Sequence, residues 1–389
     1  MKALHTSDWH VGKRIGRYDR SVEFADAIDE VVGIADQHAV DLVLHSGDVF
    51  DRPIPPVDAL NIALDGLVRL SADGERPVVV IAGNHDSAGF FEALAPFLRK
   101  QNIHLIGEIK KPDEGGVLDI ATPGGRAVVS CFPFLREGRA FHAWEPVDEH
   151  YKRYAQRLIA ISEAYSAHAT SIAGCDAVTF LMAHFLVGGA KVHGHGAPRG
   201  ERELHMGETY ATTSAAIPAG PQYVALGHIH APQPVPGAKV PAEYAGSLLE
   251  LDFGEAGEEK RVVMVDVEPG RPAVVTSMPL TAGRRLVRAK GTWQALLVRD
   301  DLAEAYLDLV VETAGPDPAL AERARDEFDF VVKVQADYPR AESDGTVREG
   351  QTLDELYAAF HETRHGIPPA DDVAAAFSQV MEEAGRASA

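Results

Sequence analysis

The sequence has little cysteine and no long apolar segment. Only Cys131 and Cys175 occur in 389 residues, which argues against a disulfide framework and against a cysteine-based zinc site. No apolar run approaches the roughly 18 residues of a membrane-spanning helix, and the opening segment MKALHTSDWH has no apolar signal region. These absences predict a cytoplasmic protein without a membrane span.

Basic residues are also scarce, since 37 Lys and Arg stand against 58 Asp and Glu, for a net charge of -21. Such a total argues against a nucleic-acid partner. However, residues 301–389 hold 20 of the acidic and only 7 of the basic residues, whereas 15 of the 17 histidines lie before them. Two divalent ions bound in the first part would offset some of its negative charge. The total charge therefore neither excludes nor supports a polyanionic substrate.

Strand and helix patterns alternate over the first 110 residues, and strand patterns dominate from 117 to 278. The expected strands are 2–6, 41–45, 77–81, 103–106, 117–120, 127–132, 177–182, 223–226 and 261–267. The expected helices are 21–38, 57–70, 90–100 and 148–168. This order predicts an α/β domain over residues 1–278 with largely buried sheets.

The pattern changes after Pro279. Residues 279–340 are predicted to be a second, small α/β domain, with strands near 286–290, 306–311 and 328–334 and a helix near 318–326. Residues 341–389 are predicted to be a linker and two short amphipathic helices, the first opened by a capping box of Thr352 and Glu355. The apolar stripes favour docking on a partner, with packing on the same chain as the alternative. The residues expected to meet the partner are Leu353, Leu356, Tyr357, Phe360, Phe377 and Val380.

Five predicted strands end in groups that bind metal ions, and loops at strand ends can bring such groups together. The candidate ligands are Asp8, His10, Asp48, Asn84, His184, His228 and His230. Seven groups are too many for one ion, so we predict two ions that share one carboxylate, for which the central Asp48 is the candidate. The imidazole-rich set is too soft for calcium or magnesium and fits manganese, iron or zinc.

Each of these residues alone is a weak signal, because single Asp and His residues after strands are usually surface or core residues. The prediction rests on their combination. His5 and His45 fall inside strands and are expected to be core residues beside the site. His193 and His195 lie in the Gly-rich segment 188–207, which we interpret as a flexible loop.

The segments DWH, GDVFD, GNHD, AHF and GHIH resemble the signature of the calcineurin-like metallophosphoesterases over about residues 1–270. The resemblance implies a β-sandwich flanked by helices (αββα) and a phosphodiester hydrolase. The segments LHTSDWHVGKR and HSGDVFDRPIPP are similar to those of DNA nucleases in this family. Those enzymes are manganese-dependent, degrade DNA ends and cut hairpins. They act in DNA repair with an SbcC-type coiled-coil ATPase, which implies a homodimer within a heterotetramer on the nucleoid.

The resemblance also implies roles for individual residues. Asp8, His10 and His230 would hold one ion and Asn84, His184 and His228 the other, with Asp48 between them. His85 would lie beside the scissile phosphate as an acid or transition-state donor, and we expect Asp86 to orient its imidazole. Some relatives have a second histidine where this chain has Asp51, so that role is not transferable. Residues 284–335 resemble a capping domain that guides DNA over the site.

Basic residues follow two of the motifs and are expected to contact DNA phosphates, although a solvated loop is the alternative. They are Lys13, Arg14, Arg17, Arg20 and Arg52.

Three other functions fit parts of the pattern. A small-molecule phosphodiesterase, for example on cyclic nucleotides, would use the same seven ligands, but the long C-terminal extension disfavours it. A phosphoprotein phosphatase is disfavoured because the third motif ends in Asp86 and not in Glu. A non-catalytic DNA-end clamp is disfavoured because the ligand set is complete.

Overall fold

The computed structural model describes residues 1–136, 147–191, 211–339, 352–365 and 367–387. Residues 192–207 of the predicted Gly-rich loop, with His193 and His195, lie outside the described residues. By its contacts the chain divides into two units, Met1–Asp337 and Tyr338–Ala389.

The first unit contains two six-stranded sheets. One has the order β14-β13-β1-β2-β3-β4, with β1 to β4 mutually parallel and β13 antiparallel to β1. Its strands are β1 (Lys2–Thr6), β2 (Leu42–His45), β3 (Val78–Ile81), β4 (Ile103–Ile106), β13 (Arg261–Asp266) and β14 (Val274–Pro279). The parallel strands are short, apolar and buried on both faces, as expected for a covered parallel sheet.

The second sheet has the order β11-β12-β10-β7-β6-β5. Its strands are β5 (Val117–Thr122), β6 (Gly125–Phe132), β7 (Ala177–His184), β10 (Tyr223–Gly227), β11 (Gln233–Pro234) and β12 (Ala242–Tyr244). One apolar core fills the space between the sheets, with Leu44 and Ile81 from the first and Phe180 and Met182 from the second. A separate two-stranded pair consists of β8 (Leu186–Val187) and β9 (Ala211–Thr212).

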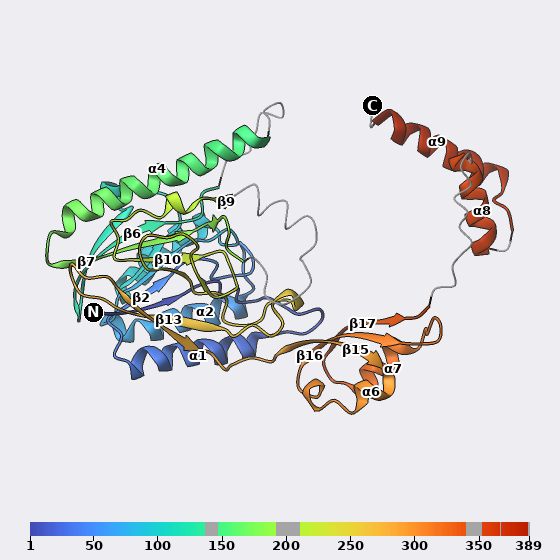
Figure 1. Ribbon diagram of the computed structural model, residues 1–389, viewed down its shortest axis with the longest axis horizontal. Helices are drawn as coiled ribbons and strands as arrows, with labels where there is room; N and C mark the ends of the chain where they lie inside the picture. Colours follow the sequence, from blue (N-terminus) through green and yellow to red (C-terminus); the bar gives the residue numbers. More distant parts are fainter. Residues whose placement is uncertain (137–146, 192–210, 340–351, 366, 388–389) are drawn as a thin grey trace. The chain divides into compact units, whose positions relative to one another are not determined.

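Helices cover the outer faces of both sheets (Figure 1). On the first sheet lie α1 (Ser21–Gln37), α2 (Val57–Leu70) and α3 (Ala88–Leu98), with Phe24, Ile28 and Leu67 in their shared core. The long α4 (Val147–Ala173) packs on the second sheet through Leu158 and Tyr165. The predicted αββα sandwich is therefore confirmed.

Residues after β14 form a small α/β layer with its own core. Three parallel strands, β15 (Leu286–Thr292), β16 (Tyr306–Glu312) and β17 (Val331–Asp337), pack with α6 (Trp293–Leu297) and α7 (Leu320–Glu327). This layer also packs on the first 278 residues, because Ile15 and Tyr18 share a cluster with Leu286 and Tyr306. The predicted boundary at 278/279 falls inside β14, and the layer belongs to the first unit.

The second unit contains α8 (Leu353–His365) and α9 (Asp371–Ala387). The predicted capping box is confirmed, since Thr352 N donates to Glu355 Oε2 at 2.8 Å and Glu355 N donates to Thr352 Oγ1 at 3.3 Å. The rings of Tyr357 and Phe377 stack at 4.1 Å and hold the two helices together. Among the described residues, no helix has both the length and the apolar character needed to cross a membrane.

Candidate metal centre

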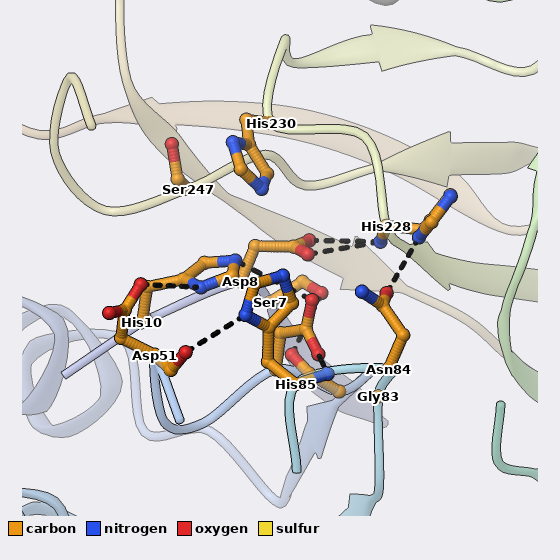
Figure 2. Close-up of polar contacts among 12 residues, drawn as sticks. Ser7, Asp8, His10, Asp51, Gly83, Asn84, His85, His228, His230 and Ser247 are labelled. Atoms are coloured by element: carbon orange, nitrogen blue, oxygen red, sulfur yellow. Dashed lines mark hydrogen bonds and ion pairs between the residues drawn. The ribbon is translucent and has the colours of Figure 1, made fainter. Parts of the chain in front are cut away.

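The seven candidate ligands lie at the carboxyl ends of parallel strands, as the sequence predicts. Asp8 and His10 follow β1, Asp48 follows β2, and Asn84 follows β3. His184 ends β7, and His228 and His230 follow β10. Because the two sheets stack, the ends of these five strands meet, and Figure 2 shows side chains from both sheets around one space.

The backbone is strained at four of these residues. Asp8, His10, Asp48 and His228 have φ angles of 50°, 49°, 55° and 92°. Residues other than glycine rarely adopt positive φ angles. Such conformations cost about 1 to 3 kcal/mol each and concentrate at functional sites. Sharp turns directly after the strands thus aim consecutive loop residues at one point.

Two glycines allow the loops to approach each other. Gly47 has a φ of 105°, and a Cβ there would lie 2.4 Å from His184 Nδ1. A Cβ on Gly83 would lie 2.1 Å from Asp48 Oδ1. A side chain at either position would push a candidate ligand out of place.

The first ligand cluster consists of Asp8, His10 and His230, whose ligand atoms all lie within 4.8 Å of one another. Both ring nitrogens of His10 are buried and have no hydrogen-bond partner among the described residues. Buried polar atoms normally find a partner, and a metal ion would supply one. The chemistry of this cluster therefore fits a bound cation.

The second cluster forms around the Asn84 side chain. Asn84 Oδ1 lies 3.0 Å from His184 Nε2 and 2.8 Å from His228 Nδ1. Ligands bound at 2.0 to 2.2 Å lie about 3 to 3.5 Å apart around one ion. Asp48 Oδ2 is 3.4 Å from His184 Nε2 and 3.5 Å from His10 Nε2. This carboxylate stands between the clusters, where a bridging ligand must stand.

Hydrogen bonds set the orientation of the imidazoles. His184 Nδ1 lies 2.8 Å from the Ser46 carbonyl oxygen, which can only accept, so Nδ1 carries the proton and Nε2 faces Asn84. His230 Nδ1 lies 2.7 Å from Glu255 Oε1 in the same way. His228 has the opposite orientation, with Nδ1 toward Asn84. Fixing one nitrogen determines which lone pair is offered to a metal.

Without bound ions, the buried charges shift one another strongly. Burial by itself would raise the pKa of Asp48, but the imidazole of His184 outweighs it and holds that pKa well below its ordinary value. Burial would lower the pKa of His184, but Asp48 outweighs it and raises the pKa to about 9. Burial lowers the pKa of His228 to about 3. His228 is therefore ready to bind a metal, whereas His184 must first lose a proton.

His85 lies beside the first cluster, with its ring centroid 4.6 Å from that of His10. Its Nδ1 lies 2.9 Å from the backbone oxygen of Asp51, and its backbone N donates to Asp48 Oδ1 at 2.8 Å. The Asp51 carbonyl thus fixes the orientation of the His85 imidazole. A contact with a backbone atom of this kind cannot be predicted from the sequence.

The expected role of Asp86 in orienting His85 is wrong. The buried Asp86 carboxylate accepts hydrogen bonds from Val49 N at 3.2 Å, Phe50 N at 3.1 Å and Gly83 N at 2.9 Å. These three amides take up the carboxylate. Two of them belong to the turn that carries Asp48 and the third to the turn that carries His85. Asp86 joins these two turns and acts on the backbone.

The expected phosphate contact of Arg20 is also wrong. Arg20 is only 1% exposed, with Nη2 2.8 Å from Glu23 Oε2 and Nη1 2.5 Å from the Glu250 carbonyl oxygen. A buried, paired guanidinium cannot reach a DNA backbone. Its neighbours Arg14 and Arg17 are exposed.

The other two predicted phosphate contacts pair with Asp51. Lys13 Nζ lies 3.2 Å from Asp51 Oδ1, and Arg52 Nε lies 3.7 Å from Asp51 Oδ2. Arg52 is more than half exposed, so pairs of this kind are weak and open to exchange with a phosphate. His5 and His45 are buried core residues, as expected, and His5 bonds Tyr223 and Ser46.

Three residues near the site escaped the sequence prediction. Phe134 stacks on His228 with ring centroids 6.1 Å apart. Arg136 donates to the carbonyl oxygen of Asn84 at 2.9 Å and to that of Asp86. Both follow β6, which is parallel to β7 and ends at the same edge. Residues 133–136, which follow this strand, include no carboxylate or imidazole, so a search for ligands passes over them. Glu255, the partner of His230, has no signal in the sequence.

Comparison with known proteins places the chain in a family. Residues 1–232 match the calcineurin-like phosphoesterase family. The chain belongs to the calcineurin-like phosphoesterases. As a member of this family it is a metal-dependent phosphoesterase, which confirms the predicted class of enzyme.

Relatives within the family are similar over most of the chain. The SbcD subunit of the SbcCD nuclease of Bacillus subtilis (strain 168) is 33% identical over 306 residues, which cover 79% of this chain and 74% of that protein. The SbcD subunit of Rhodobacter capsulatus is 31% identical, covering 75% and 73% of the two chains. That of Escherichia coli (strain K12) is 28% identical, covering 75% and 71%. The predicted resemblance to the nuclease branch of the family is thereby confirmed.

Proposed function

We propose that this chain is a two-metal DNA nuclease that degrades double-stranded ends and cuts hairpins, with Mn²⁺ as its metal. It would act as a homodimer within a heterotetramer with an SbcC-type coiled-coil ATPase. The observation that carries the proposal is the position of Asp48, 3.5 Å from His10 and 3.4 Å from His184, between two complete ligand clusters. The similarity to SbcD subunits of the SbcCD nuclease favours DNA as the substrate.

Asp8, His10 and His230 would hold one ion, Asn84, His184 and His228 the other, and Asp48 would touch both. When bound, the ions supply positive charge for the phosphate and a water of lowered pKa as nucleophile. The neutral amide of Asn84 is suited to this task, since a carboxylate there would cancel one positive charge where a phosphodiester must bind. The mixture of imidazole, carboxylate and amide ligands suits Mn²⁺.

His85 would act on the leaving group. Its Nδ1 is held by the Asp51 carbonyl oxygen at 2.9 Å, so Nε2 is the atom that acts on substrate. In the imidazolium form, Nε2–H can give its proton to the departing oxygen or stabilise charge on it. The backbone bond from His85 to Asp48 Oδ1 fixes the distance between this donor and the bridging carboxylate.

Digestion of a DNA hairpin with Mn²⁺ tests the proposal against its rivals, with cyclic nucleotides assayed in parallel. We expect hairpin opening and loss of double-stranded ends. Hydrolysis of cyclic nucleotides without DNA cleavage would favour a small-molecule phosphodiesterase. Tight DNA binding without cleavage of either substrate would favour a non-catalytic clamp.

A triple variant of Lys13, Arg14 and Arg17 to alanine should bind DNA more weakly and with a shallower salt dependence. Each lost phosphate contact lowers the slope of log K against log salt by about 0.9, so the slope should fall by roughly 2 to 3. A triple alanine variant of Lys2, Arg99 and Lys100 is the matched control, because Lys2 begins β1 and Arg99 and Lys100 precede β4, at the opposite edge of the sheet. Equal slopes for both variants, measured by fluorescence anisotropy, would rule out this DNA path.

The second unit would dock on the ATPase. Tyr357 and Phe377 hold α8 and α9 together, which leaves Leu353, Leu356, Phe360 and Val380 at 57%, 49%, 56% and 61% exposure. Deletion of residues 350–389 should abolish association with the ATPase in size-exclusion chromatography and leave Mn²⁺-dependent nuclease activity in place. A variant with serine at Leu353, Leu356 and Phe360 should do the same. Full association of either variant would refute the docking site.

Mn²⁺ binding should release a proton from His184. A pKa of about 9 means that His184 is protonated at pH 7, and an imidazole must be neutral to bind a metal. The apparent affinity of that ion should therefore rise about tenfold per pH unit between pH 6 and 8. Calorimetry in buffers of different ionisation enthalpy measures the released proton, and a His184→Gln variant should not release it. An affinity independent of pH would contradict the assignment.

A further inference from the structure

Glu255, the partner of His230, is buried beside the candidate metal centre. It ends the short 3-10 turn Phe253–Glu255, and it is only 2% exposed. Its Oε1 lies 2.7 Å from Nδ1 of His230. Through this contact the His230 ring links the turn to the first ligand cluster of Asp8 and His10, and Figure 2 shows the ring close to the Asp8 carboxylate.

The Glu255 carboxylate is itself held in place. Its Oε2 accepts hydrogen bonds from Lys260 Nζ at 2.8 Å, Leu251 N at 3.0 Å and Ser247 Oγ at 3.2 Å. The turn before it is closed by Asp252, whose Oδ1 accepts from Gly254 N. A carboxylate with three donors on one oxygen has a single orientation available, with the other oxygen directed at His230.

Lys260 fixes the same histidine from a second direction. Its ammonium donates to the His230 carbonyl oxygen at 3.2 Å, to Glu255 at 2.8 Å and to Glu258 Oε2 at 2.7 Å. The cation is 6% exposed and has two carboxylate partners. Backbone and ring of His230 are thus both tied to one buried charge network.

We propose that Glu255 is a positioning residue of the metal centre. It accepts the Nδ1 proton of His230, so that the Nε2 lone pair faces the ion shared with Asp8 and His10, and Lys260 is its fixed counter-ion. Partners of this kind raise the basicity of a ligand and determine its orientation, and their loss costs roughly 10- to 100-fold in metal affinity. The inference rests on the proposed two-metal function, since it assigns His230 to an ion.

Two matched variants separate positioning from simple stability. Glu255→Gln and Glu258→Gln each remove one carboxylate partner of Lys260 and leave the other, so neither leaves the buried cation unpaired. Of these two carboxylates, Glu255 lies against the His230 ring, and among the described residues Glu258 bonds Lys260 and not that ring. In calorimetric titrations with Mn²⁺ alone, we expect Glu255→Gln to weaken one of two ions by roughly 10- to 100-fold and Glu258→Gln to leave both within about threefold of the unmodified chain.

Electron paramagnetic resonance of the Mn²⁺-loaded protein distinguishes a coupled pair of ions from a single ion. A change in fold stability alone would not alter this spectrum. The unmodified chain and Glu258→Gln should show the signal of a coupled Mn²⁺ pair. At the same limited Mn²⁺ concentration, Glu255→Gln should show the six-line signal of a single ion. Equal affinities and equal spectra for the two variants would overturn the inference, as would equal losses in both.

A His230→Ala variant distinguishes the inference from the function beneath it. If His230→Ala loses one ion and Glu255→Gln does not, Glu255 has no positioning role and the two-metal assignment stands. If His230→Ala retains both ions, the ligand assignment itself fails. Circular dichroism and thermal unfolding without metal identify a variant that has merely lost its fold. If Glu255→Gln has lost its fold, Glu255→Ala takes its place in the comparison with Glu258→Gln.

Discussion

Replacing Asp48 with alanine should remove both bound Mn²⁺ ions and all metal-dependent cleavage. The Asp48 carboxylate lies 3.5 Å from His10 Nε2 and 3.4 Å from His184 Nε2, so it belongs to both clusters. We expect cleavage to fall by about a thousandfold or more, which corresponds to the several kcal/mol that bound metal ions contribute to phosphoryl chemistry. Calorimetric titration with Mn²⁺ measures the binding, and hairpin digestion measures the cleavage.

Asp51→Ala is the matched control for this variant. Asp51 is also an acidic residue beside His10, at 3.9 Å from Nδ1, but it does not stand between the clusters. The variant keeps the Asp51 backbone oxygen that holds His85, so both ions and most of the activity should remain. If Asp48→Ala bound two ions as tightly as Asp51→Ala does, Asp48 could not be the bridging ligand.

His85→Ala should lose cleavage but keep both ions, in contrast to Asp48→Ala, which should lose both. No hydrogen bond joins the His85 imidazole to a candidate ligand in the described structure, where its Nδ1 lies against the Asp51 carbonyl oxygen. Loss of a general acid slows a reaction by roughly 10² to 10⁴. Single-turnover cleavage of a hairpin at saturating Mn²⁺ measures the loss, and calorimetry measures the ions.

Asn84→Ala is the complementary variant, one residue away on the same turn. It removes the oxygen that lies 3.0 Å from His184 and 2.8 Å from His228, so it should weaken one ion and recover part of its activity at high Mn²⁺. His85→Ala should not recover at any Mn²⁺ concentration. Activity of His85→Ala close to that of the unmodified chain would exclude His85 from the chemistry.

The convergence of the candidate ligands could be predicted from the sequence because chain order and position agree. Each of five candidates comes after an apolar run that is visible in the sequence, namely Asp8, Asp48, Asn84, His184 and His228. In each sheet the carboxyl ends of parallel strands lie at one edge, and in this protein the two edges meet. The position of a metal-binding residue type directly after such a run therefore predicts where its side chain lies in the fold.

Residues whose roles depend on the path of the loops could not be predicted. Arg20 follows the first motif closely, but the start of α1 turns it inward onto Glu23 and Glu250. Asp86 adjoins His85 in sequence, but its side chain faces the amides of another turn. Neighbouring residues in a tight turn point in different directions, and sequence proximity does not show which contacts they make.

The role of Glu255 could not be predicted from the sequence either. It lies 25 residues after His230 in a segment without a strand or helix pattern of its own. Its contact with the imidazole depends on the short turn Phe253–Glu255 and on the buried Lys260, neither of which a local pattern encodes. The partners of the candidate ligands are therefore found from structure, although the candidates themselves follow from sequence.

Anomalous scattering from Mn²⁺-soaked crystals tests the central claim most directly. We predict two peaks about 3.5 to 4 Å apart, one against Asp8, His10 and His230 and one against Asn84, His184 and His228. Asp48 should lie between them. A single peak at full Mn²⁺ saturation, or two peaks that Asp48 does not touch, would contradict the two-metal assignment.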